Sequence, residues 1–202
     1  MIFATEENEN PFPHLQEHNG YLTGQLLIAT PQLVEDTFHR SVIYVFAHDE
    51  GGAMGIVVNR PLPGIHFSSL FEQMDIPLKE IRGDVPVYVG GPVDRSRGFV
   101  IYNGDYPCAE AISVSNGIGV TASAGILRDI AQGTGPEKCL ISVGYAGWSA
   151  GQLESEIEQN SWLTVPATQE LLFDMPDSTK WAMASGQLGI DMGFYSSAVG
   201  HA

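Results

Sequence analysis

Residues 41–61, SVIYVFAHDEGGAMGIVVNRP, carry the clearest architectural signal in the chain. Residues 41–49 are rich in β-branched and aromatic side chains, which are enriched in β-strands. A turn signal, Glu50-Gly51-Gly52, follows, and residues 53–61 return to β-rich sequence. Two such runs joined by a short loop that contains glycine predict a β-hairpin.

Further β-rich runs lie on both sides of this hairpin. Residues 85–91 and 98–104 flank the charged segment PVDRSR, and this arrangement predicts a second hairpin. The remaining strands are expected at residues 21–30, 109–115, 139–146 and 161–166. Strands therefore gather in the first two thirds of the chain and helices later, which favours the α+β class with a mostly antiparallel or mixed sheet.

The helical patterns are short and begin at residues that cap helices. Ser69, Ser123 and Ser149 are the predicted N-caps, the last two for helices at 124–131 and 150–159. Two more helices are expected at 168–173 and 179–188, the second with Trp181 and Leu188 facing inward.

Composition sets limits on the class of protein. The chain has 202 residues, of which 44% are hydrophobic, so it can bury a full core in one domain, expected at 21–202. Residues 1–20 are rich in Asn, Pro and acidic residues and are expected to form a flexible tail. Two cysteines without CxxC spacing predict reduced thiols, and we expect a cytoplasmic protein. No apolar run approaches the roughly 18 residues that a membrane-spanning helix needs.

The net charge constrains the partners. The chain carries 24 acidic and 9 basic residues, which gives a formal charge of −15. Such a surface repels phosphate backbones, and the sequence has no helix-turn-helix pattern with a basic recognition helix. We therefore do not expect direct binding of nucleic acid.

The segment Gly147-Trp148-Ser149-Ala150-Gly151 matches G-x-S-x-G, the pattern of a serine nucleophile elbow. The elbow needs a histidine base held near the hydroxyl, and the only histidine downstream of Ser149 is His201, next to the C-terminus. The hairpin-rich pattern also differs from the parallel sheet of that hydrolase fold. The sequence therefore favours Ser149 as a helix cap, and no catalytic residue is assigned.

Two other motif matches lack the context that they require. His14-Leu15-Gln16-Glu17-His18 fits a zinc-protease pattern, but nearby prolines and Asn19-Gly20 leave little room for a helix. Residues 117–122, GIGVTA, fit a dinucleotide-binding pattern without a suitable acidic residue on the next strand. We therefore predict neither a metal nor a cofactor.

Scarce arginines give the strongest hint of a ligand site. Arg40, Arg60, Arg95 and Arg97 are four of nine basic residues, and each lies at a predicted strand end or tight turn. One interpretation is an anion-binding cleft, because guanidinium groups recognise anions in two-pronged fashion. The other is a set of arginines that tie hairpins together through carboxylates or carbonyl groups. The candidate ligand-binding residues are Arg40, Asn59, Arg60, Arg97 and His48.

Several long motifs, in order, resemble the AlgH/YqgE family of bacterial proteins. They include GQLLIATPQL, the 36–62 region, PVYVGGPVDRSRGFVIY and GYAGWSAGQLESEIEQNSWLTVPA. The resemblance implies an α+β fold with a bifurcated sheet folded into a pseudo-barrel, and it carries a label of transcriptional regulation. It implies no catalytic residues. One departure is Gly125, which stands where relatives have an acidic residue.

Two functional hypotheses follow. The first is a non-catalytic binding or regulatory protein that recognises a protein partner or a small anionic ligand, without reading DNA directly. The alternative is a small-anion sensor or enzyme that uses the arginine-lined cleft. The sequence contains no complete catalytic set, so whether the protein is an enzyme stays open.

Overall fold

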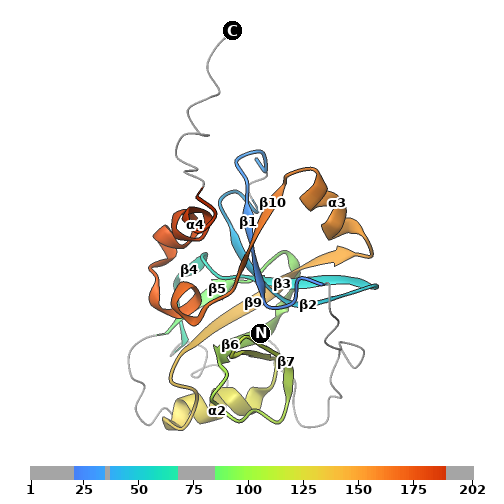
Figure 1. The fold of residues 1–202 in the computed structure, drawn as a ribbon. Helices are drawn as coiled ribbons and strands as arrows, with labels where there is room; N and C mark the ends of the chain where they lie inside the picture. Colours follow the sequence, from blue (N-terminus) through green and yellow to red (C-terminus); the bar gives the residue numbers. More distant parts are fainter. Residues whose placement is uncertain (1–20, 35–36, 68–84, 190–202) are drawn as a thin grey trace.

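The structure is a computed structural model that describes residues 21–34, 37–67 and 85–189. Its strands are β1 Gln25–Ala29, β2 Val42–Asp49, β3 Gly52–Val57, β4 Pro61–His66, β5 Pro86–Val89, β6 Val93–Asn103, β7 Ala111–Ser115, β8 Ile118–Thr121, β9 Cys139–Ser149 and β10 Trp162–Pro166. Its helical elements are α2 Ala124–Gln132, α3 Gln152–Glu158, the π-helical turn η1 Glu170–Asp174 and α4 Asp177–Gly186. The strands form one mostly antiparallel sheet that curls into a half-barrel, with the short helices packed against it (Figure 1), which confirms the α+β class.

The hairpin at residues 41–61 forms as predicted. β2 and β3 pair antiparallel from Ile43 opposite Val57 to Asp49 opposite Gly52, with a bulge between Val45 and Ala47. Every residue of β2 before Asp49 is buried, because both faces of this strand are covered. A strand buried on both faces reads as a continuous apolar run rather than as an alternating one.

The second predicted hairpin is wrong. β5 and β6 do not pair with each other, because both pair with β9. β5 runs parallel to β9, with Val87 opposite Ile141, while β6 runs antiparallel, with Val100 opposite the same Ile141. The two strands therefore lie on opposite sides of β9, and residues 93–97 of the charged segment lie within β6 rather than in a turn.

β9 is also the strand at which the sheet divides. Its residues 141–143 pair with β5, and its residues 146–149 pair with β3. Gly144 lies at the fork with φ 72°, and a Cβ atom at Gly90 would lie 2.2 Å from its carbonyl oxygen. The crossing of backbones at this distance leaves no room for side chains. Gly144 of GYAGWSAG and Gly90 and Gly91 of VGG therefore allow the bifurcation that the family resemblance implied.

Three hydrophobic cores fill the spaces around the forked sheet. One, here called the inner core, is built around Tyr44, Phe46 and Phe99 and includes Leu171 and Leu172 of η1 and Ala184 of α4. A second core lies beneath α2, and a third beneath α3 includes two tryptophans. Each helix thus covers a different part of the sheet.

The helix caps agree with the sequence in one case and differ in another. Ser123 caps α2, since its hydroxyl accepts a hydrogen bond from the Gly125 amide, and Gly133 ends the helix with φ 76°. Ser149 is not the cap of α3. It is the last residue of β9, and Gly151, with φ 73°, precedes α3. The strand pairing with β3 holds Ser149 in extended backbone, so the helix begins later.

The remaining predictions have mixed outcomes. The residues 117–122 that fitted a dinucleotide pattern form the turn after β7 and then β8, not the start of a helix. Trp181 packs against the inner core as expected, but Leu188 is 41% exposed because α4 ends before it. The helix predicted after Ser69, the acidic tail and the His14–His18 motif lie outside the described residues.

Candidate functional site

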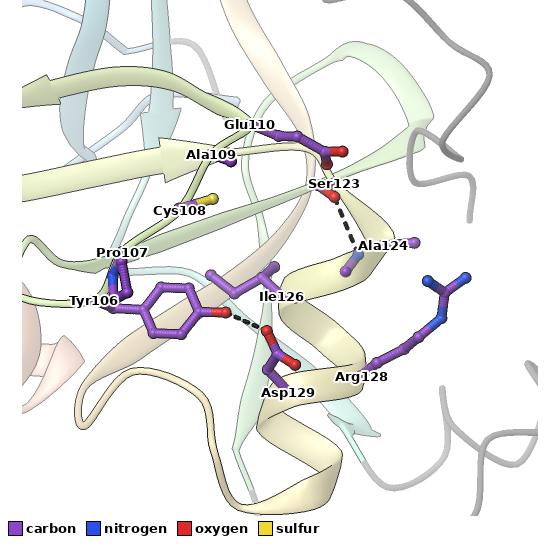
Figure 2. Close-up of a pocket in the computed structure, with 11 residues that line it drawn as sticks. Tyr106, Pro107, Cys108, Ala109, Glu110, Ser123, Ala124, Ile126, Arg128 and Asp129 are labelled. Atoms are coloured by element: carbon purple, nitrogen blue, oxygen red, sulfur yellow. Dashed lines mark hydrogen bonds between the residues drawn. The ribbon is translucent and has the colours of Figure 1, made fainter.

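A pocket of about 250 Å³ lies beside the start of α2. Residues 106–110, which precede β7, form one wall, and the first turns of α2 with Ser123 form the other (Figure 2). Gly125 belongs to the second wall, and a Cβ atom there would meet only the Ser123 hydroxyl, at 3.2 Å. This position therefore leaves open space where a longer side chain would enter the pocket.

A buried threonine holds the two walls together at one end. The Thr121 hydroxyl donates to the carbonyl oxygen of Glu110 at 2.7 Å and accepts a hydrogen bond from the Ser123 amide at 3.1 Å. Ser123 in turn accepts from the Gly125 amide at 3.0 Å. This chain of hydrogen bonds fixes where α2 begins relative to the opposite wall.

A tyrosine closes the pocket at the other end. The Tyr106 hydroxyl donates to the Asp129 carboxylate, and its ring packs edge-on against Tyr102 with centroids 5.8 Å apart. Burial and the neighbouring Asp129 carboxylate raise the pKa of Tyr106 above its ordinary value, because both disfavour the tyrosinate. Tyr106 is therefore held as a neutral donor.

The polar groups of the pocket suit binding more than bond-making. Its two hydroxyls, on Ser123 and Tyr106, are already engaged in hydrogen bonds that position the walls. Figure 2 shows Arg128 reaching outward from α2, with Glu110 on the opposite wall and the half-buried Cys108 between the walls. The pocket thus combines one cation, two carboxylates and the amide end of a helix, without a hydroxyl hydrogen-bonded to a histidine base.

Three of the five residues predicted as a ligand site meet at one loop. The Asn59 side chain accepts from the Val42 amide at 2.9 Å and donates to the carbonyl oxygen of Arg40 at 2.9 Å. Arg60 donates through its guanidinium to the carbonyl oxygens of residues 37 and 39, at 2.6 and 2.5 Å. These contacts hold the connection between β1 and β2 against the end of β3.

The Arg40 side chain points to a different neighbour. Its guanidinium carbon lies 5.3 Å from the centre of the Trp181 ring, a cation–π contact that joins the loop to α4. Arg40 itself has φ 54°, in the left-handed region that non-glycine residues seldom adopt. Its backbone conformation therefore belongs to the same loop arrangement that Asn59 and Arg60 support.

The other two residues lie apart from this loop. His48 is at the opposite end of β2, is buried, accepts the Leu22 amide at Nδ1 (3.0 Å) and donates from Nε2 to Glu154 (2.9 Å). The amide hydrogen bond fixes the neutral tautomer with its proton on Nε2. Arg97 lies in β6, 3.6 Å from the Asp94 carboxylate. The structure therefore divides the five residues among three places.

The pocket itself was missed by reasoning from sequence. Ser123 and Gly125 were noted only as a helix start, and Tyr106 and Asp129 carried no motif. These two residues are 23 positions apart and meet because β6 and α2 pack in the same core. The one local signal of the pocket was Gly125. A glycine early in a helix lowers the stability of the helix, so its presence there indicates some other role.

Within the described ranges, two other kinds of site are absent. No group of three or more His, Cys, Asp or Glu side chains is arranged to hold a metal ion in the part of the chain that the structure describes. Among those same residues, no helix is both long and apolar enough to cross a membrane.

Comparisons with known proteins agree with these features of sequence and fold. A family model described as AlgH-like matches residues 26–193. A UPF0301 protein of Afipia carboxidovorans is 46% identical over 190 residues, which cover 90% of each chain. A UPF0301 protein of Rhodospirillum rubrum is 45% identical over 188 residues, which cover 93% of this chain and 98% of that protein.

Two experimental structures share the fold. The solution structure of the AlgH protein from Pseudomonas aeruginosa superposes with a TM-score of 0.72 at 39% identity, and covers 93% of this chain and 99% of its own. A crystal structure of a protein from Corynebacterium diphtheriae superposes with a TM-score of 0.70 at 20% identity, which is a likeness of fold alone.

Proposed function

The chain belongs to the AlgH-like family, and from this we propose that it is a non-catalytic binding protein with a regulatory role. The pocket beside α2 is proposed as its binding site. The observation that carries the proposal is that no histidine of the described ranges lines the pocket: the Tyr106 hydroxyl donates to the Asp129 carboxylate, and the Ser123 hydroxyl caps α2 by accepting from the Gly125 amide. A nucleophile must be free to react and must adjoin a base, so this arrangement favours binding.

The hydrolase hypothesis finds no support at Ser149. A nucleophile elbow places its serine on a strained turn between strand and helix, whereas here the left-handed residue is Gly151 and Ser149 pairs with Gly52 in the sheet. A fluorophosphonate probe is expected to leave Ser149 unlabelled. Labelling that disappears in Ser149→Ala would contradict this.

The proposed ligand is a small anion. Support comes from the start of α2, whose amide groups favour negative charge, and from Arg128 at the rim. Glu110 and Asp129 limit this preference and argue against a highly charged ligand. A small carboxylate or inorganic phosphate is therefore the probe of choice.

Position 125 offers a matched pair of variants for the test. Gly125→Asp places a carboxylate at the pocket wall, and Gly125→Ala adds a side chain without charge. Bound anion raises the melting temperature of the native state, so phosphate or acetate should stabilise the natural protein and Gly125→Ala but not Gly125→Asp. Equal shifts in all three proteins would remove the pocket as the anion site.

Regulation is proposed to proceed through the ligand or a protein partner, not through direct DNA reading. Support comes from the net charge of −15 and from the described helices, where α3 has no basic residue and the one lysine of α4 is buried. We place the protein in the cytoplasm. An electrophoretic mobility assay should show no complex with DNA at moderate salt, and sequence-selective binding would overturn this part of the proposal.

The alternative, an anion sensor or enzyme using the arginine set, is favoured by one observation. Arg40, Asn59 and Arg60 meet at the β1–β2 connection, where they contact backbone carbonyl oxygens and the Trp181 ring. If this loop were the anion site, phosphate stabilisation would survive Gly125→Asp and disappear in Arg60→Gln. Gly125→Asp and Arg60→Gln together thus distinguish the two candidate anion sites.

A further inference from the structure

α4 buries fewer apolar side chains than α2 does. Its buried residues are Lys180, Ala184 and Ser185, of which two are polar, while Met183 on the same helix is 50% exposed. α2, by contrast, buries two alanines, an isoleucine and a leucine. α4 therefore gains less from the hydrophobic effect than α2 does.

A buried ammonium group makes the first set of contacts. The Lys180 Nζ donates to the carbonyl oxygen of Val58 at 3.0 Å and to Asp177 at 2.8 Å, and it lies 5.5 Å from the centre of the Tyr88 ring. The Tyr88 hydroxyl donates to both oxygens of the same Asp177 carboxylate, at 3.1 and 3.2 Å. Lys180 is only 2% exposed, so this ammonium is almost fully removed from water.

An indole makes the second set. The Trp181 Nε1 donates to the carbonyl oxygen of Ala29 at the end of β1, at 2.8 Å. The Arg40 guanidinium lies over the Trp181 ring. α4 is thus held at the ends of β1 and β3 and at β5 by these polar contacts, and its apolar contacts with the inner core come from Ala184 and the partly buried Trp181 ring.

Such contacts contribute little net free energy to docking. A polar contact replaces a contact with water, and the removal of an ammonium from water offsets much of its attraction to a carboxylate. Burial lowers the pKa of Lys180, although Asp177 acts in the opposite direction. The cost of removing the ammonium from water is therefore larger than its attraction to the carboxylate. Segments with few buried apolar contacts open at lower free energy than the core.

We propose that α4 is a releasable cover: it detaches from the inner core as a unit while the forked sheet stays folded. Release uncovers the Tyr88 ring and two backbone acceptors, the carbonyl oxygens of Ala29 and Val58. The device is separate from the pocket beside α2, because none of these residues lines that pocket.

Native-state hydrogen exchange of the full chain tests this. Protected amides of α4 should exchange at least about 100-fold faster than those of β2 and β9, with a weaker dependence on denaturant, since opening α4 exposes little surface. Exchange of α4 at the rate and denaturant dependence of β2 would overturn the proposal.

Two variants sharpen the test. Lys180→Ala should accelerate α4 exchange by about tenfold or more, because it leaves the Val58 carbonyl oxygen without its donor and the Asp177 carboxylate without its neighbouring cation. Val45 lies in the core on the opposite face of β2. Val45→Ala should accelerate amide exchange in β2 but leave exchange in α4 unchanged, because the contacts of Val45 are still made when α4 opens. Equal acceleration of α4 in Val45→Ala would mean that α4 opens only with the whole protein. The denaturant dependence of the natural protein decides the question if either variant does not fold.

Discussion

One carboxylate organises the core beneath α3. Oε2 of Glu156 accepts hydrogen bonds from the indole nitrogens of Trp148 and Trp162, both at 2.8 Å. The two rings meet edge to face with centroids 6.0 Å apart, and each is less than a tenth exposed. Trp148 of the G-x-S-x-G segment is therefore positioned by a helix that follows it, and this contact is structural.

Replacing that carboxylate should be costly. Glu156→Ala leaves two buried indole N–H groups without an acceptor, and each unmet donor costs about 1–3 kcal/mol, so we expect a loss of roughly 2–6 kcal/mol. Glu156→Gln should recover part of it, because the amide oxygen still accepts. Urea unfolding measures the difference, with the exposed Glu158→Ala of the same helix as control. Equal stability of the two alanine variants would show that water satisfies the indoles.

Single residues also show the limit of reading sites from sequence. The Ser123 cap could be predicted, because a serine and the amides of the following turn are neighbours in the chain. Neither the Tyr106–Asp129 bond nor the Glu156 carboxylate shared by two tryptophans could be, because each requires packing of separate elements. Of the predicted arginines, Arg40 and Arg60 lie in loops as expected, whereas Arg95 and Arg97 lie within β6. Their ligand role stays a prediction.

At the scale of elements, the two serines predicted as caps, Ser123 and Ser149, give a matched comparison. Ser123→Ala should cost about 1 kcal/mol, because it removes the acceptor for an orphan amide of α2. Ser149→Ala should change stability by less than about 0.5 kcal/mol, since Ser149 contributes its backbone amide, at 3.0 Å from the Gln152 side chain, and not a side-chain cap. Thermal or urea unfolding distinguishes them, and a larger loss at Ser149 would reinstate it as a capping residue.

The fork in β9 should tolerate no side chain at its centre. Gly144 has φ 72°, and a Cβ atom there would lie 2.6 Å from the carbonyl oxygen of Gly91. Gly144→Ala should therefore cost about 2–4 kcal/mol through backbone strain and contact. Gly186→Ala, where a Cβ atom meets open space at the end of α4, is the control and should be neutral or slightly stabilising. A Gly144→Ala protein as stable as the control would mean that the strands separate without cost.

For the molecule as a whole, buried tyrosines govern the response to alkali. Burial raises the pKa of Tyr44, Tyr88 and Tyr102 above the ordinary value of 10.0. Above pH 10 the unfolded chain loses protons that the folded chain keeps, so the free energy of unfolding falls as pH rises. Each group contributes a slope of about 1.4 kcal/mol per pH unit. Burial lowers the pKa of Lys180 below its ordinary 10.5. Just below pH 10.5 the unfolded chain therefore binds the proton that the folded chain has lost, so Lys180 raises the free energy of unfolding with pH and offsets part of the tyrosine slope.

Urea unfolding in steps from about pH 8 to pH 11 tests this, together with tyrosinate absorbance. Ionisation of these three tyrosines should accompany loss of structure, whereas exposed tyrosines can ionise in the folded protein. Complete ionisation near pH 10 with the fold intact would contradict the assignment.

Much of the local structure follows from neighbouring residues. The β2–β3 hairpin, the start and end of α2 and the α+β class could be predicted, because turns, caps and strand propensity act over a few positions. The tertiary structure decided which strand pairs with which. β5 and β6 both look like hairpin arms in sequence, yet each joins β9, because a β-rich segment can pair with any edge that buries its apolar side chains. The pocket beside α2, the two tryptophans on Glu156 and the polar docking of α4 arise from that pairing, since they join residues that only the folded sheet brings within reach.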